Sequence, residues 1–335
     1  MILHPGILAL TVGSLIVLAM LLYAYTIAIK ILRNWNINSS TEEQLLLERK
    51  TYLVSTMVQY SLAFEIISIF LFIYTADDIH RLLVGAMCAT GSLNANSLGF
   101  PALYAKIVMF FLSAAWIALN YIDNCAEDYP LIKTKYLFLV FLIPVAITEI
   151  FLQTNYFLNL SPNVITSCCG VLFSEEGESI ASSLASFPVL PMKIVFYGSV
   201  LNMTFIGILM YRRPNSRYAW IFSFAALAMF IISILSVISF ISLYFYQLPT
   251  HHCPFDILQA EYYYIGYPLY ISLFSGSFFG MMVGPISIFR HISSLREVIK
   301  KAQQRWTLIS VAGVLIFTVI ASIPILFLPF AIKGY

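Results

Sequence analysis

Two short stretches of the sequence gather side chains that could do chemistry. "TSCCGVLF" (166–173) holds two adjacent cysteines, and "PTHHCPFD" (249–256) sets two adjacent histidines directly before a third cysteine. Thiolate sulfur and imidazole nitrogen suit Cu(I) or Zn(II) better than hard cations. Together with Cys88, which the orientation derived below places on the same side of the membrane, these stretches predict a soft-metal site, favoured as copper-like with zinc also possible, for the binding, delivery or transport of the ion. Its residues would be Cys88, Cys168, Cys169, His251, His252 and Cys253.

Two other interpretations of the same cysteines stay open. The first is a thiol–disulfide oxidoreductase that exchanges electrons with a membrane quinone, with Cys253 as the reactive thiol before Pro254. A redox C-x-x-C pair would need a cysteine at position 256, where the sequence has Asp256, so the partner thiol must come from another loop. The second is a receptor or scaffold subunit in which four cysteines form two structural disulfides, with three possible connectivities. The sequence therefore leaves open whether the protein is an enzyme.

The elements that must position these side chains are membrane-spanning helices. Of the 335 residues, 60% are hydrophobic and 10% are charged, and the mean hydropathy is +0.88. Runs of about 20 apolar residues are long enough to cross the hydrocarbon core of a bilayer as helices, which satisfy their backbone groups internally. We predict an all-α, polytopic integral membrane protein with eight spans, near residues 6–29, 52–75, 101–122, 136–154, 190–210, 218–245, 264–289 and 306–330.

The basic residues predict the orientation of these spans. Fourteen of the 18 lysines and arginines lie in the first, third, fifth and seventh connections, whereas the second, fourth and sixth together hold only Arg81. Positively charged loops stay in the cytoplasm, so both termini are predicted to be non-cytoplasmic. Cys88, Cys168, Cys169 and Cys253 then share the non-cytoplasmic side, where disulfides are permitted. The predicted location is a bacterial inner membrane.

The order of the spans suggests an internal duplication within a single transmembrane domain, 1–335. The halves would be 1–155 and 186–335, joined by a non-cytoplasmic loop, 156–185. "GFPALY" (99–104) and "GYPLY" (266–270) follow a single cysteine at equivalent places in the two halves. Parallel repeats of this kind are related by an axis along the membrane normal.

Four ionisable residues fall inside predicted spans. Charged groups at this depth usually face the protein interior or a cavity. A lysine near the interface can also extend its amine to the headgroups. We expect either glutamate to pair with one of the two lysines if the helices adjoin, with a neutral glutamate as the other solution. The four are Glu65, Lys106, Glu149 and Lys193.

Other features predict architecture and partners. Gly276, Gly280 and Gly284 form a small-residue stripe suited to close helix packing. Residues 294–305, "SLREVIKKAQQR", could form a short basic helix on the inner membrane surface. Expected partners are membrane lipid and other membrane or periplasmic subunits. Haem is not expected, because no histidine lies within a span and no C-x-x-C-H occurs, and no basic face suits nucleic acid.

Overall fold

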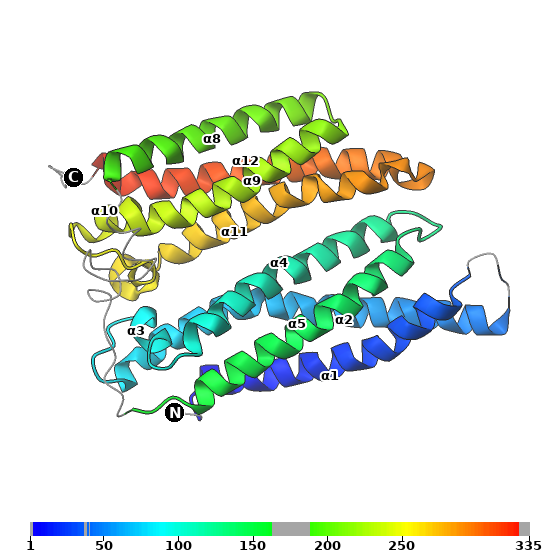
Figure 1. Ribbon diagram of the computed structural model, residues 1–335, viewed down its shortest axis with the longest axis horizontal. Helices are drawn as coiled ribbons and strands as arrows, with labels where there is room; N and C mark the ends of the chain where they lie inside the picture. The colour runs from blue at the N-terminus through cyan, green and yellow to red at the C-terminus, as the bar shows by residue number, and fades with distance from the viewer. Residues whose placement is uncertain (1–2, 37–38, 40, 163–187, 328–335) are drawn as a thin grey trace. The chain divides into compact units, whose positions relative to one another are not determined.

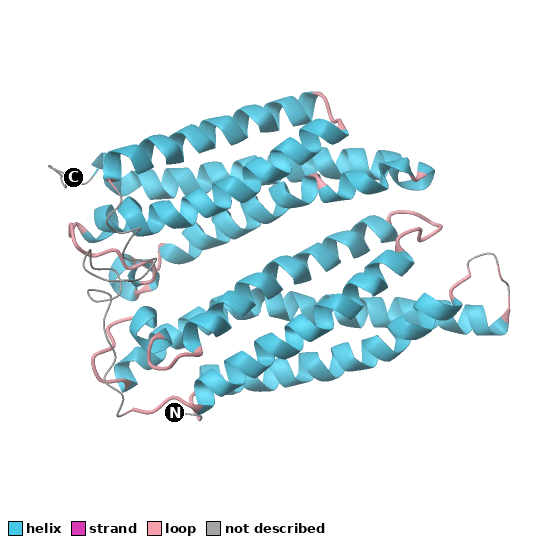
Figure 2. Cartoon of the chain, viewed as in Figure 1, coloured by secondary structure: helices cyan, strands magenta, loops and turns pink. Residues whose placement is uncertain are grey.

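The computed structural model describes residues 3–36, 39, 41–162 and 188–327 of the chain. Within these ranges the protein is built from helices and contains no strand (Figure 2). Eight helical stretches of the described chain are long and apolar enough to cross a membrane, which confirms the predicted number of spans. They are α1 (Pro5–Asn34), α2 (Glu42–Asp78), α4 (Gly99–Asn124), α5 (Ile132–Leu158), α8 (Val189–Arg212), α9 (Ser216–Ser236) with α10 (Ser242–Tyr246), α11 (Gly266–Val283) and α12 (Arg296–Phe327).

Several helices continue well beyond the apolar runs from which they were predicted. The 37 residues of α2 correspond to about 56 Å of helix at about 1.5 Å per residue, against a hydrocarbon core of about 30 Å. Helix α2 accordingly runs past the ends of α4 and α5 (Figure 1). Residues 296–305 are helical as predicted, but they are the first turns of α12 and do not form a short helix of their own. An apolar run marks only the hydrocarbon part of a helix, because polar side chains can continue it into water.

The chain packs into two compact units. Unit 1 contains Met1–Ala76, Leu93–Val164 and Ile292–Val298, and therefore helices α1, α4, α5 and α2 up to Ala76; the last two residues of α2, Asp77 and Asp78, belong to unit 2. Unit 2 contains Asp77–Ser92, Ile165–His291 and Ile299–Tyr335, and therefore α8 to α11 and most of α12.

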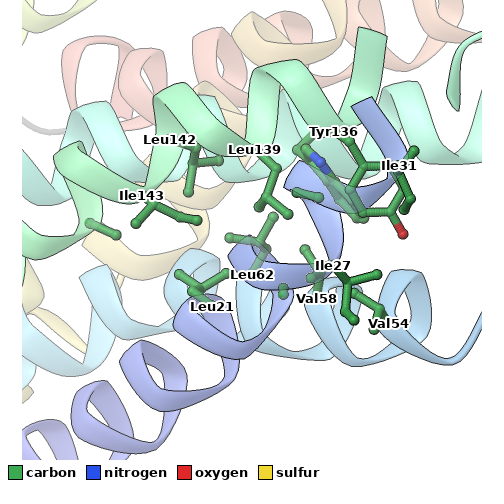
Figure 3. Packing of buried hydrophobic residues seen from close by; sticks show 14 of the residues in the cluster. Leu21, Ile27, Ile31, Val54, Val58, Leu62, Tyr136, Leu139, Leu142 and Ile143 are labelled. Atoms are coloured by element: carbon green, nitrogen blue, oxygen red, sulfur yellow. The ribbon is translucent and has the colours of Figure 1, made fainter. Parts of the chain in front are cut away.

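Helices α1, α2 and α5 share the hydrophobic core of unit 1 (Figure 3). Leu21 and Ile27 of α1 meet Val58 and Leu62 of α2, and Leu139 is among the α5 residues that complete the cluster. Helix α4 packs against α5 and adds apolar side chains to the same core. A packed apolar interior of this kind leaves little room for unsatisfied polar groups.

The predicted glycine stripe is the packing face of α11 in unit 2. A Cβ atom added to Gly313 of α12 would lie 2.8 Å from the Gly276 Cα and 2.9 Å from the Ser272 carbonyl oxygen. At Gly280, an added Cβ would lie 2.6 Å from the Ala226 Cβ of α9. Ser310 donates a 2.6 Å hydrogen bond to the Gly276 carbonyl, which becomes reachable at this close approach. Helix α11 therefore contacts α12 backbone to backbone and packs closely against the Ala226 methyl group of α9.

A π-helical segment, Val237–Ile241, joins α9 to α10 without interrupting the span. Its wider turn displaces backbone carbonyls from the usual ladder and makes them available to other donors. The α10 helix ends at Gln247, which adopts the left-handed conformation with φ 55°. Residues 247–265 follow as the connection to α11. They contain the stretch "PTHHCPFD" (249–256).

Candidate metal and thiol site

Cys88 and Cys253 lie side by side in unit 2, although 165 residues separate them in sequence. Their sulfur atoms are 3.5 Å apart, and the two side chains are 1% and 0% exposed. Cys88 directly precedes the short helix α3 (Ala89–Leu93), and Cys253 belongs to the connection between α10 and α11. The two connections that hold them were predicted to lie on the same side of the membrane, and here they meet.

Asp256 adds a carboxylate to the two thiols. One ligand atom each from Cys88, Cys253 and Asp256 lies within 4.8 Å of the others, and all three residues are buried. The Cys253 thiol donates to Asp256 Oδ1 across 3.1 Å. Asp256 opens a three-residue 3₁₀ turn, Asp256–Leu258, which brings its carboxylate back toward the cysteine three residues earlier. Two sulfurs and an oxygen therefore surround one small volume.

Polar groups also converge on the Cys253 sulfur. The Phe255 backbone N–H donates to it at 3.4 Å, and the Thr90 hydroxyl lies at 3.3 Å. These contacts hold the Cys253 sulfur between polar groups of α3 and of its own connection. A thiolate is the form of cysteine that binds metal ions and attacks disulfides.

His251 pairs with the carboxylate of Asp256. Its Nε2 lies 2.5 Å from Asp256 Oδ2, so the two carboxylate oxygens face Cys253 and His251 respectively. The hydrogen bond to Asp256 raises the pKa of the His251 imidazole, while burial opposes that shift. Burial raises the pKa of the Asp256 carboxyl, and the hydrogen bond from His251 opposes it. The pair can therefore hold a proton next to Cys253 and pass it to the half-buried imidazole.

His252 has a different role from its neighbour. Its Nδ1 lies 2.8 Å from the carbonyl oxygen of Ile238, in the π-helical segment. A carbonyl only accepts, which assigns the proton to Nδ1 in this contact. His252 thus links the connection between α10 and α11 to the π-helical segment of the α9–α10 span.

Hydrogen bonds at both ends fix the two connections to each other. Gln259 donates to Asp77 Oδ1 at 3.0 Å and to the Met87 carbonyl at 3.1 Å. The Asp77 carboxylate also accepts from the Ala89 backbone N–H at 3.1 Å. The Tyr246 hydroxyl, at the end of α10, donates to the Cys253 carbonyl at 2.7 Å. The cysteines are therefore held by a network that involves the ends of α2 and α10.

The remaining predicted residues fall into three groups. Cys168 and Cys169 lie outside the described residues. In unit 2, Lys193 donates to the Tyr244 hydroxyl at 2.6 Å and lies 4.3 Å from the centre of that ring. Glu65, Lys106 and Glu149 come together inside unit 1, which is one of the two lysine pairings that the sequence allowed.

The sequence did not identify several polar residues that matter. Asp77, Asp256 and Gln259 were overlooked because isolated polar residues in loops carry no distinctive pattern. The spacing of Asp256 three residues after Cys253 was the available signal. Asp123 and Lys135 were assigned to a cytoplasmic connection, yet they form a buried 2.7 Å ion pair between α4 and α5. The helices continue past the apolar runs and carry both residues into the protein interior.

Comparison of the chain with protein families, curated proteins and solved structures gives no match. What can be stated is an all-helical integral membrane protein with a buried cluster of two cysteines and an aspartate.

Proposed function

We propose that this membrane protein binds a thiophilic metal ion through Cys88, Cys253 and Asp256, and that it serves the binding, delivery or transport of that ion. The observation that carries the proposal is the convergence of three buried ligand atoms within 4.8 Å. Sulfur and carboxylate oxygen together are donors that zinc accepts readily, whereas Cu(I) favours sulfur. Zinc is therefore favoured over copper.

The separation of the sulfurs supports the same ion. Zinc–sulfur bonds are about 2.3 Å long, so two thiolates on one tetrahedral zinc would lie about 3.8 Å apart. The observed 3.5 Å requires only a small adjustment. Three protein ligands leave a fourth position for water, cargo or another protein group, as in zinc sites that exchange ligands. His251 is hydrogen-bonded to the other carboxylate oxygen of Asp256, and an outer-shell partner of this kind orients a metal ligand.

Metal content tests this proposal directly. The full chain is purified without oxygen, reductant or chelator, loaded with zinc or with Cu(I), desalted, and analysed for metal and protein. We expect one ion per chain in the wild type and in Cys125→Ser, whose cysteine is exposed and outside the cluster. Cys88→Ser and Cys253→Ser should lose the ion. A wild type that retains neither metal would overturn the proposal.

Replacing the outer-shell histidine refines the test. Such partners typically contribute about 10-fold to 100-fold in metal affinity. We expect His251→Gln to weaken zinc binding within that range, measured by competition with a chromophoric chelator. His291→Gln is the matched control, since His291 is exposed and follows the other end of α11. Equal effects at both histidines would exclude the proposed support of Asp256.

Thiol–disulfide exchange is the second candidate, and the Cys253–Asp256–His251 chain of hydrogen bonds favours it. Oxidation of the two thiols to a disulfide would release two electrons and two protons, which a membrane quinone would take up as it becomes a quinol. Asp256 and His251 would carry protons away from Cys253. Differential alkylation with mass spectrometry separates the candidates: thiols that react only after chelation indicate metal, whereas a Cys88–Cys253 disulfide formed on adding quinone indicates redox chemistry.

The predicted orientation places this site on the non-cytoplasmic side, which for a bacterial inner membrane is the periplasm. Basic residues are concentrated in the opposite connections. On that side the protein would meet periplasmic or membrane subunits that supply or receive the ion. Two permanently oxidised disulfides with no metal and no response to quinone would instead indicate the receptor or scaffold role.

A further inference from the structure

A second cluster of polar groups lies within the helix bundle of unit 1. Lys106 Nζ of α4 lies 2.6 Å from Glu149 Oε1 of α5 and 3.9 Å from Glu65 Oε2 of α2. The three side chains are 1%, 0% and 1% exposed respectively. Lys106 also donates to the Ser68 hydroxyl at 3.0 Å. We refer to Glu65, Lys106 and Glu149 as the triad.

The charges of the triad do not balance. Two carboxylates and one ammonium leave one negative charge if all three groups are ionised, and uncompensated charge is costly inside an apolar bundle. Asp123 and Lys135, at another place in unit 1, show the balanced alternative of one carboxylate with one ammonium. The triad therefore needs one additional positive charge to become neutral.

The charged groups acting on Glu65 can be identified element by element. Helix α4 contributes Lys106 and helix α5 contributes Glu149, while Ser68 provides a neutral hydroxyl from α2 itself. On α1 the nearby polar group is the neutral Ser14, which accepts a hydrogen bond from Gln153 of α5. Among the described residues of these helices, the balance thus depends on the triad alone.

The distances to the Lys106 amine indicate which carboxyl receives the extra charge. Glu149 is the closer ion partner of Lys106, by 2.6 Å against 3.9 Å. Glu65 Oε1 and both carboxylate oxygens of Glu149 are buried without a hydrogen-bond partner, so the ammonium of Lys106 is the main support for either carboxylate. The Ser68 hydroxyl has one hydrogen, which it can give either to the Glu65 backbone carbonyl at 2.8 Å or to Glu65 Oε2 at 3.3 Å. Glu65 is therefore the carboxyl with the weaker support as an anion.

We propose that the triad is a proton-binding site within the membrane-spanning bundle, where Glu65 takes up and releases one proton while Lys106 and Glu149 remain ionised. Uptake converts the Glu65 carboxylate to a carboxylic acid and makes the triad neutral. Release returns the proton to water and leaves Lys106 shared between two carboxylates, a movement that its flexible side chain permits. A site of this kind would couple the state of unit 1 to protonation, as buried carboxyls do in membrane transporters.

Infrared spectroscopy can count protonated carboxyl groups in the full-length protein, reconstituted in lipid nanodiscs at neutral pH. The readout is the carbonyl stretching band of a carboxylic acid, which shifts in D₂O. Relative to the wild type, we expect Glu65→Gln to lose the intensity of one carboxylic acid. Glu43→Gln, an exposed position on the same helix, should leave the band unchanged.

Two further variants test the charge count rather than the mere presence of Glu65. In Glu149→Gln, one carboxylate and one ammonium remain, so Glu65 should ionise and its band should disappear although the residue is still there. In Lys106→Met, both glutamates should be protonated and the band should gain the intensity of one more group. Glu65→Gln and Glu149→Gln are close in shape to the native side chains, which keeps the test usable if Lys106→Met fails to fold.

Three results would overturn the proposal. The first is a wild-type spectrum from which Glu65→Gln removes no carboxylic acid band. The second is a band that persists in Glu149→Gln at wild-type intensity. The third is a Glu65 carboxylic acid band that keeps its full intensity at every pH at which the protein stays folded, because a group that never releases its proton does not exchange one.

Discussion

Buried polar side chains between these helices are satisfied by single, specific partners, as Lys135 shows. Lys135 is buried, and its amine lies 2.7 Å from Asp123 Oδ2 and donates to Asn120 Oδ1 at 3.0 Å. Asp123 Oδ1 in turn accepts from the Leu131 backbone N–H at 2.7 Å. This network closes the turn between α4 and α5. One lysine thus satisfies a buried acid, an amide and, indirectly, the start of a helix.

Lys135→Met is expected to destabilise the protein strongly. Removing one partner of a buried ion pair typically costs about 3–5 kcal/mol, because the other charge is left buried without compensation. Lys133→Met is the matched control, since Lys133 lies two residues earlier and is exposed. The free energy of unfolding in mixed micelles should fall markedly for Lys135→Met alone. Similar values for the two variants would contradict the role assigned to the pair.

The cysteine site shows how far residues alone could predict function. The cysteines at 88 and 253 share a predicted membrane side, and their sulfurs meet in the structure. Whether they bind metal stays a prediction. Asp256 could not be singled out, because a carboxylate three residues from a cysteine is common in loops. The Asp256 carboxylate is directed toward the sulfurs by the 3₁₀ turn at Asp256–Leu258, and no residue pattern in the sequence predicts that turn.

At the scale of elements, backbone contact rather than side-chain volume determines the packing of α11. The distances at Gly276 and Gly313 leave no space for a methyl group without moving a backbone. The glycine spacing in the sequence predicted this face correctly. It could not predict which helix lies opposite, since Gly313 carries no signal that distinguishes it from other helical glycines.

Gly313→Ala should therefore lower stability by about 1–3 kcal/mol, as expected when a well-packed interior is overfilled. Gly198→Ala on α8 is the comparison, because a Cβ there meets nothing within 4 Å. Alanine also favours a helix over glycine by about 1 kcal/mol, so Gly198→Ala should be neutral or stabilising. Thermal denaturation in detergent would measure both. A stable Gly313→Ala variant would mean that α11 and α12 can separate without penalty.

Helix ends are the elements that the sequence predicted least well. Apolar runs located all eight spans, yet α2 begins ten residues before its run and α12 begins ten residues before its own. An apolar run in the sequence marks the part of a helix that lies in the hydrocarbon core. The end of the helix is determined by its backbone hydrogen bonds, which can continue into water. This difference explains why Lys135 was taken for a loop residue.

For the whole molecule, the predicted orientation remains the central assumption behind the proposed function. It depends on the uneven distribution of lysine and arginine among the connections. Cys125 provides a natural probe, because its thiol is exposed and follows the end of α4 on the predicted cytoplasmic side. The orientation also governs whether the Cys88–Cys253 cluster faces an oxidising compartment.

A membrane-impermeant maleimide should not label Cys125 in intact cells and should label it after permeabilisation. Tyr263→Cys in a Cys125→Ser background should behave in the opposite way, since Tyr263 is 92% exposed in the connection that carries Cys253. Mass spectrometry of the modified peptides gives the readout. Labelling of Cys125 from outside intact cells would reverse the orientation and place the cysteine cluster in the cytoplasm.

The length of α2 has a practical consequence for imaging. Residues 42–50, "EEQLLLERK", continue the helix past the ends of its neighbours α4 and α5 (Figure 1). A soluble helical protein inserted between α1 and α2, with its last helix in register with Glu42, would share the rigidity of α2 and stand clear of the detergent micelle. Such a fiducial would give electron cryo-microscopy particles a feature by which to align, which small membrane proteins usually lack. The native helix would serve as the rigid joint at one end of the inserted protein, and the connection from α1 would join the other end.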